Sequence, residues 1–247
     1  MEQQIELFLE YMQDQRHAGK NTLESYSRDL RKFRQYMEEN GKSDARDMIA
    51  TNLTGYVLYM ERSGLSSATI SRSIASIRAF FLFLLRRGII HMDPSEQLHP
   101  PKVEKKVSSQ IGSSDIKRLL RTPDLHTSKG IRDLAMLELL YSGGVRVSEL
   151  IELRPEDVHL ELDYICCHTE ERERVLSFDR KTHEVLAQYL QEIRPTLSQE
   201  SGYLFLNSRG RRLSRQGVWK MIRQYASKLD IDEVITSQKI RNAGRKE

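Results

Sequence analysis

The sequence LLYSGGVRVSEL contains Arg146, the residue whose surroundings are best suited to chemistry. An apolar helix is expected to end at the two glycines, and a new helix is expected to begin with Ser148 as its N-cap. Arg146 would then lie beside unpaired backbone N–H groups, where a guanidinium can bind a phosphate through two hydrogen bonds. The same spacing also suits a structural corner in which Arg146 pairs with Glu149 or Glu152, and spacing alone favours this second interpretation.

Basic residues are distributed unevenly along a chain whose formal net charge is only +4. Residues 62–92 contain five arginines and no acidic residue, and residues 203–247 contain 11 basic residues against 4 acidic ones. Two separate cationic regions suggest a polyanionic partner contacted from two sides, although a solvated basic face explains the charge alone equally well. The candidate contact residues are Arg72 and Arg78 in the first region and, in the second, Arg209, Arg211, Arg212, Arg215, Lys220 and Arg223.

Residues 1–90 are expected to form a bundle of four helices joined by short turns that contain glycine. In the second helix, about 21–40, apolar residues recur every three or four positions, and Asn21 with Glu24 resembles a capping box. The fourth helix is expected to begin near Ser66 and to end at Gly88, with Arg72 and Arg78 outside its apolar stripe. That stripe consists of Ile70, Ile74, Ile77, Phe81 and Leu84.

Residues 91–112 are expected to be a linker, because they contain three of the six prolines and no helical periodicity. The pattern of residues 113–247 is mixed and dominated by helices. Helices are expected at about 114–121, 130–142, 148–153, 181–193 and 214–228, and strands at Tyr164–His168, Arg174–Phe178 and Tyr203–Leu206. The expected fold class is therefore mainly α with a small antiparallel β-sheet.

Several kinds of site and location are disfavoured by the sequence. Phosphate-binding loops, dinucleotide-binding glycine motifs and zinc-protease motifs are absent. Cys166 and Cys167 are adjacent, which suits packing in a strand better than a disulfide framework or a metal site. No apolar run approaches the ~18 residues of a membrane span, and the N-terminus lacks the residue order of a signal peptide. We therefore expect a cytoplasmic protein with no metal and no other cofactor.

Segments spread over nearly the whole chain resemble the tyrosine recombinases (the phage-integrase and Xer group), and the Xer type most closely. GGVRVSELIEL, after an apolar helix, is similar to the first-arginine motif of that family. NTLESYSRDLRKFRQYM and SSATISRSIASIRAFFLFLLRRGII are similar to helices of its N-terminal SAM-like core-binding domain, and PSEQLHPPKVEKK is similar to its linker. RPEDV, ERERVLSF and YLFLNSRGRRLSRQGVWKMIRQYA follow in the order of its catalytic α+β domain. The resemblance implies a SAM-like bundle in 1–90 and an incomplete catalytic-type domain in 113–247.

The resemblance also implies double-stranded DNA as the partner and a metal-free transesterification as the reaction. In the family, a tyrosine attacks the phosphodiester and forms a 3′-phosphotyrosyl bond. Two arginines with histidine or tryptophan donors hold the non-bridging oxygens, while a hairpin lysine protonates the leaving 5′-oxygen. Fixed cationic donors of this kind suit phosphoryl transfer. A helix of the N-terminal domain faces the major groove, which is the place that the resemblance implies for Arg72 and Arg78.

Residue by residue, the match to the family's catalytic positions is partial. Arg146 matches the first arginine and Arg241 matches the second. Thr169 stands where the family has the hairpin lysine, and Gln238 stands where it has a histidine; neither transfers a proton near neutral pH. The sequence ends at Glu247, before the position of the family's nucleophile, and none of its ten tyrosines has a matching context. We therefore expect a DNA-binding member of the family that is deficient in strand cleavage.

Two alternatives remain open at this stage. The first is an active site-specific recombinase whose C-terminus is missing from this chain, and the substitutions at Thr169 and Gln238 count against it. The second is a helical interaction protein that no longer binds DNA, and the retention of Arg146 and Arg241 counts against that. Assembly with a partner recombinase or with further copies of the chain is compatible with the family.

Overall fold

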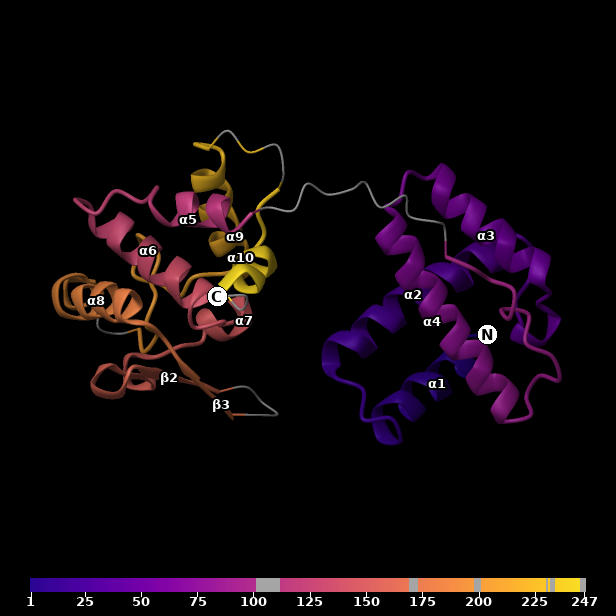
Figure 1. The fold of residues 1–247 in the computed structure, drawn as a ribbon. Coiled ribbons are helices and arrows are strands. Elements are labelled where there is room, and N and C mark those ends of the chain that lie inside the picture. Colours follow the sequence, from indigo (N-terminus) through magenta and orange to yellow (C-terminus); the bar gives the residue numbers. More distant parts are fainter. Residues whose placement is uncertain (101–111, 169–172, 198–200, 230, 232–233, 245–247) are drawn as a thin grey trace. The chain divides into compact units, whose positions relative to one another are not determined.

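The chain forms two compact units, Met1–Lys105 and Lys106–Glu247, which are described separately (Figure 1). The computed structural model describes residues 1–247 except 101–111, 169–172, 198–200, 230, 232–233 and 245–247. The expected fold class is confirmed, because helices dominate both units and one small antiparallel sheet lies in the second. Thr169 lies outside the described residues.

The first unit is a bundle of four helices, as the apolar periodicity predicts. The helices are α1 (Glu2–Asp14), α2 (Lys20–Glu39), α3 (Ala50–Arg62) and α4 (Ser67–Arg86), with a 3₁₀ turn at Ala45–Asp47. The Ser66 side chain accepts a hydrogen bond from the Thr69 amide and so caps α4. The capping box expected at Asn21 is wrong, because α2 begins at Lys20 after Gly19 and Asn21 lies inside its first turn.

Helix α4 supplies much of the apolar core of the first unit. All five residues of its expected stripe are buried. Aromatic rings pack edge to face across the bundle, with Phe80 against Phe8 and Phe81 against Phe33 at centroid distances of 5.7 and 6.1 Å. Ile90 and Leu98 belong to the same core, so the chain beyond α4 still packs on this unit.

Helix α4 also corrects one expectation about apolar length. Its 20 residues make it long and apolar enough to cross a membrane by length and composition, which the sequence analysis did not anticipate. Half of the apolar stretch of this helix is buried inside the unit, and Arg72 and Arg78 interrupt its exposed side. These features are those of a helix that crosses the core of a helical bundle.

The second unit is built around α6, which is buried along most of its length. Its helices are α5 (Ser113–Leu120), α6 (Ser128–Tyr141), α7 (Val147–Leu150), α8 (Arg180–Gln188), α9 (Arg215–Ala226) and α10 (Ser237–Gly244). One π-helical turn (Tyr189–Ile193) continues α8, and 3₁₀ turns lie at Pro155–Asp157, Leu160–Leu162 and Arg194–Thr196. Buried apolar side chains from all six helices and the sheet form a single core.

The sheet of the second unit has the order β1-β2-β3, and both pairings are antiparallel. Strands β2 (Tyr164–His168) and β3 (Glu173–Ser177) form the expected hairpin, while β1 (Val158–His159) was not expected. The strand expected at Tyr203–Leu206 is wrong. That segment is held instead by single contacts: the Leu204 amide donates to the Leu153 carbonyl at 2.7 Å, and Leu206 forms an isolated bridge with Arg212.

Candidate functional site

The turn between α6 and α7 positions Arg146. Gly144 has a φ of +64°, a conformation that favours glycine, and it turns the chain sharply after α6. Helix α7 then begins at Val147 with Arg146 as its N-cap, so the expected cap at Ser148 is wrong. The Arg146 amide donates to Oε2 of Glu149 at 2.7 Å. Glu149, the third residue of α7, therefore binds the amide of the N-cap residue, which is the reciprocal half of a capping box.

Glu149 is also the centre of a cluster of charges. Its side chain is fully buried, and its Oε1 accepts from Nη1 of Arg174 at 2.6 Å and from Nη1 of Arg146 at 3.4 Å. A buried carboxylate is tolerated only when its charge is balanced in this way. The Arg146 side chain is nevertheless 57% exposed. The pairing with Glu149 and an accessible guanidinium thus occur together, whereas the sequence analysis treated them as alternatives.

Arg174 is a residue of this cluster that the sequence analysis did not assign to a site. It lies on β3 opposite Cys167 of β2, which is buried, while its neighbours Glu173 and Val175 are exposed. Burial raises the pKa of the Cys167 thiol to about 12, which suits the expected packing role. Strand alternation places Arg174 on the inner face of the hairpin, and that signal could have identified it.

Arg241 lies on α10, which packs closely against α6. A Cβ atom added at Gly244 would lie 1.9 Å from the backbone oxygen of Tyr141, so the close approach requires glycine there. The Nε atom of Arg241 is buried and has no hydrogen-bond partner among the described residues. Gln238, almost one turn earlier, is exposed.

A mostly apolar hollow of about 240 Å³ lies where α7, α9 and α10 meet. Its lining includes Val147 of α7, Trp219 and Ile222 of α9, and Thr236 and Ser237 at the start of α10. The residue after Arg146 and the helix that carries Arg241 therefore contribute to one hollow, and the same part of the unit contains α7 and α10 in Figure 1. The structure brings the elements of the two matched arginines together.

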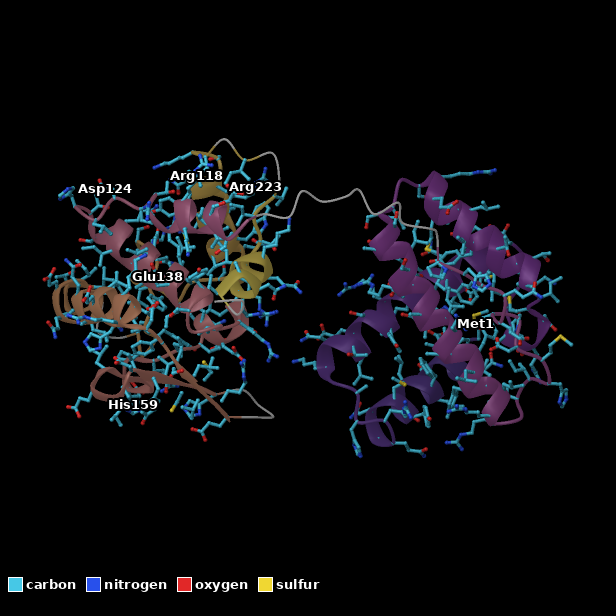
Figure 2. The ribbon with its side chains drawn as sticks, viewed as in Figure 1. Met1, Arg118, Asp124, Glu138, His159 and Arg223 are labelled. Carbon is cyan, nitrogen blue, oxygen red and sulfur yellow. The ribbon has the colours of Figure 1, made fainter. Side chains whose placement is uncertain are left out.

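The expected basic surface of the second unit is exposed, but its members differ in their pairing. Arg223 projects from α9 and lies 4.9 Å from the Trp219 ring centroid (Figure 2). Arg212 is already paired, because its Nη1 donates to both carboxylate oxygens of Glu152 at 2.6 and 2.7 Å. The remaining members are exposed and have no ion pair among the described residues: Arg209, Arg211, Arg215 and Lys220.

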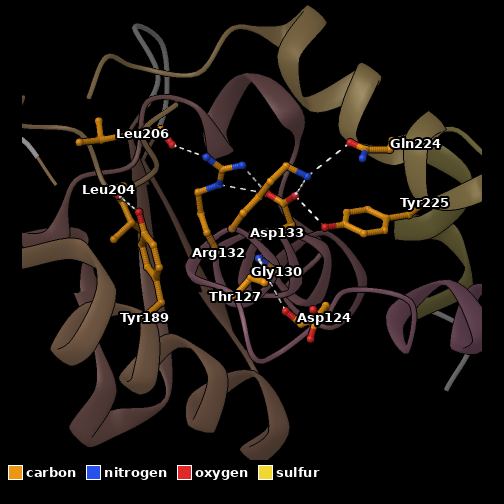
Figure 3. Close-up of polar contacts among 11 residues, drawn as sticks. Asp124, Thr127, Gly130, Arg132, Asp133, Tyr189, Leu204, Leu206, Gln224 and Tyr225 are labelled. Carbon is orange, nitrogen blue, oxygen red and sulfur yellow. Dashed lines mark hydrogen bonds and ion pairs between the residues drawn. The ribbon is translucent and has the colours of Figure 1, made fainter. Parts of the chain in front are cut away.

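A buried polar network holds the elements that carry this surface (Figure 3). Asp133 of α6 is fully buried; its Oδ1 accepts from Arg132, and its Oδ2 accepts from the Tyr225 hydroxyl at 2.9 Å and from Lys129 at 3.1 Å. Arg132 also donates to the Leu206 carbonyl at 2.8 Å. Burial and the nearby Asp133 raise the pKa of Tyr225. One carboxylate thus connects α6 to α9 and to the segment that precedes Arg209.

In the first unit, Arg72 and Arg78 are both exposed on α4, as expected. Nη2 of Arg72, however, donates to Oδ1 of the buried Asp29 at 2.8 Å, and the Ser76 hydroxyl donates to the other oxygen at 3.1 Å. Arg78 has no ion pair among the described residues. The expected exposure therefore holds for both arginines, and Arg72 in addition pairs with a buried carboxylate.

Comparisons with known proteins identify the family. A model of the phage integrase family matches residues 110–245, and a model of the phage integrase N-terminal SAM-like domain matches residues 5–88. The chain belongs to the phage integrase family of tyrosine recombinases. It is 36% identical over 248 residues to the tyrosine recombinase XerD of Oceanobacillus iheyensis, covering 98% of this chain and 83% of that protein. It is 35% identical over 240 residues to XerC of Roseiflexus castenholzii, covering 95% of this chain and 76% of that protein.

Solved structures of integrases have the same fold at low sequence identity. One is the Tn1549 transposon integrase in complex with transposon right end DNA, with a TM-score of 0.76 and 15% identity over 98% of this chain and 84% of that one. Another is a lambda integrase dimer bound to a COC′ core site, with a TM-score of 0.74 and 14% identity over 99% of this chain and 84% of that one. The mostly helical architecture is therefore that of the tyrosine recombinases.

Proposed function

We propose that this Xer-like member of the family binds double-stranded DNA and holds a phosphodiester with Arg146 and Arg241, but lacks the proton transfer needed for strand cleavage. The observation that carries the proposal is the accessible guanidinium of Arg146, fixed by the buried Glu149. The exposed arginines of α4, α9 and the segment before α9 supply further phosphate contacts. Two of the structural relatives were solved with DNA, which supports DNA as the partner here.

The proposed phosphate site works by charge stabilisation. A phosphodiester gains negative charge on its non-bridging oxygens during phosphoryl transfer, and guanidinium donors fixed in advance stabilise that charge without reorganising. Arg146 is held at the N-terminus of α7 by its own backbone bond to Glu149. Arg241 is held by the packing of α10 on α6. Gln238 can add one hydrogen bond from its amide.

The proposed deficiency rests on two substitutions. Threonine at 169 and glutamine at 238 replace the lysine and the histidine that the family resemblance implies. Neither side chain gains or loses a proton near neutral pH, so neither protonates a leaving 5′-oxygen. The arginines cannot replace them as acids, because a guanidinium keeps its proton.

A nicked duplex that traps a covalent intermediate tests the deficiency. We expect no covalent protein–DNA adduct on a denaturing gel, and a stable adduct would overturn this part of the proposal. A matched duplex with sulfur as the bridging 5′ atom sharpens the result, because a thiolate leaves without a proton. Because none of the ten tyrosines matches the family's nucleophile, adduct formation with the sulfur duplex alone would show both that another side chain attacks and that the defect with the ordinary duplex is the missing acid.

Salt dependence tests DNA binding itself. We expect duplex affinity to fall steeply with salt, because each neutralised phosphate contributes about −0.9 to the slope of log K against log salt. A flat response, or no binding at low salt, would favour a helical interaction protein. Within the same proposal, residues 1–90 are the core-binding domain, 91–112 the linker and 113–247 the catalytic-type domain. The protein would act in the cytoplasm with a partner recombinase or with further copies of itself.

A further inference from the structure

We propose that Arg174 is a further phosphate-contacting residue, held beside Arg146 by the carboxylate that the two side chains share. This inference rests on the proposed DNA-binding function and adds a contact to it. Arg174 lies on β3, whereas Arg146 lies at the start of α7, so the site would combine groups from the sheet and from the helices.

The geometry places two guanidinium groups at one oxygen atom. Nη1 of Arg174 and Nη1 of Arg146 both donate to Oε1 of Glu149, at 2.6 and 3.4 Å. The shorter bond is the one to Arg174, which identifies Arg174 as the principal cation for this carboxylate. The Glu149 side chain has no exposed surface, whereas the side chains of Arg146 and Arg174 are 57% and 25% exposed, so both arginines join this buried carboxylate to the surface.

The charges in this cluster do not cancel. One carboxylate faces two guanidinium groups, which leaves an excess of one positive charge beside the exposed Arg146. Among the described residues, Arg174 makes no ion pair other than the one with Glu149. Its side chain is 25% exposed and a guanidinium has five N–H donors, so donors remain available for an incoming anion.

A structural role alone explains only part of this arrangement. Balancing Glu149 requires only one cation, yet the guanidinium groups of both Arg174 and Arg146 lie within reach of its Oε1. A phosphodiester has two non-bridging oxygens that share its charge. A guanidinium beside Arg146 therefore adds donors for these oxygens to those that Arg146 and Arg241 supply in the proposed site. Arg174 would stabilise charge there and would not donate a proton.

The test is the salt dependence of binding to a mixed-sequence duplex of about 30 base pairs. For Arg174→Gln we expect the magnitude of the slope to fall by about 0.9, because one phosphate contact is lost. The matched control is Arg180→Gln, since Arg180 lies just after β3, is 92% exposed and pairs only with Glu184 among the described residues. We expect the control to keep the slope of the unmodified protein.

A second pair of variants keeps the test valid if Arg174→Gln fails to fold, because that change removes the main partner of a buried carboxylate. Glu149→Gln removes the charge, and Glu149→Gln with Arg174→Gln then removes the arginine without leaving a buried ion. We expect the double variant to have a slope about 0.9 smaller in magnitude than Glu149→Gln alone. Equal slopes would overturn the inference and leave DNA binding intact. Failure of the unmodified chain to bind the duplex would overturn the proposed function instead.

Discussion

Asp29 in the first unit and Asp133 in the second are both buried, but they are satisfied in different ways. Asp29 depends on Arg72, whose side chain is 41% exposed on α4, and on the hydroxyl of Ser76. Asp133 is bound by Arg132, Lys129 and Tyr225, and none of these three belongs to the expected DNA-binding residues. In the first unit one arginine serves both the core and the surface. At Asp133 these tasks belong to different residues, so folding and binding should be separable around this carboxylate, whereas Arg146 and Arg174 at Glu149 combine both tasks as Arg72 does.

The largest expected effect comes from removing the carboxylate of the second unit. Asp133→Ala leaves the Tyr225 hydroxyl without its acceptor and the largely buried Arg132 guanidinium without its counter-charge, and it should lower the free energy of unfolding by about 3–5 kcal/mol. Urea denaturation followed by circular dichroism measures this. Glu184→Ala is the control, because its pair with Arg180 is exposed, and its effect should stay within about 0.5 kcal/mol. Similar free energies of unfolding for the two variants would contradict the structural role assigned to Asp133.

Arg72→Ala should affect both stability and binding. It deprives the buried Asp29 of its cation and should cost about 1–2 kcal/mol, a value reduced by the partial exposure of Arg72. Arg78→Ala and Arg223→Ala, which remove surface charges that have no ion pair among the described residues, should change stability by less than about 0.5 kcal/mol while weakening duplex binding. Thermal denaturation and a binding titration on the same samples distinguish these outcomes. If Arg72→Ala is as stable as Arg78→Ala, the proposed coupling in the first unit does not exist.

A smaller effect is expected for Asp29→Asn, which removes the charge of Asp29, when it is combined with Arg72→Ala. Asparagine can still accept the Ser76 hydrogen bond but carries no charge, so the double variant should recover about 0.5–1 kcal/mol relative to Arg72→Ala. Denaturant titrations of the two single variants and the double variant give the coupling energy. Additive effects would show that the Arg72–Asp29 pair contributes nothing to the bundle.

The last prediction concerns alkaline pH, where buried tyrosines of both units should respond. Burial raises the pKa of Tyr56 and of Tyr189 to about 12 from the ordinary value of 10.0. Below pH 10 these tyrosines are neutral in the folded and in the unfolded chain, so their contribution to the free energy of unfolding is fully present. Between pH 10 and 12 only the unfolded chain ionises, and this contribution is lost. Tyr56→Phe and Tyr189→Phe should each flatten the decline of stability with pH. Unchanged pH profiles would contradict this.

Local periodicity predicted the four helices of the first unit, the buried stripe of α4 and the β2–β3 hairpin, because these depend on neighbours in the sequence. Capping and edge pairing were harder to predict. Ser148 and Asn21 are good caps by residue type, but the actual N-cap positions are occupied by Arg146, whose amide is bound by the buried Glu149, and by Gly19. Tyr203–Leu206 has strand-like composition, yet it packs by single bonds to Leu153 and Arg132 rather than in a ladder.

The site shows the same division between local and long-range information. Arg146 and Arg241 follow from motifs, and their helices do meet at one hollow. Arg174 is 25 residues from its partner Glu149, and Arg72 is 43 residues from Asp29. Contacts over such separations depend on the packing of distant elements, which spacing along the chain does not encode. The exposure of the candidate arginines was therefore easier to predict than their ion-pair partners.

The glycine at the end of α10 makes the second arginine sensitive to a very small change. A single methyl group at Gly244 would occupy the place of the Tyr141 carbonyl oxygen, so α10 would have to slide or tilt to accept it. Arg241 lies on the same helix, almost one turn before Gly244. Gly244→Ala would therefore move Arg241 without replacing any charged residue of the site.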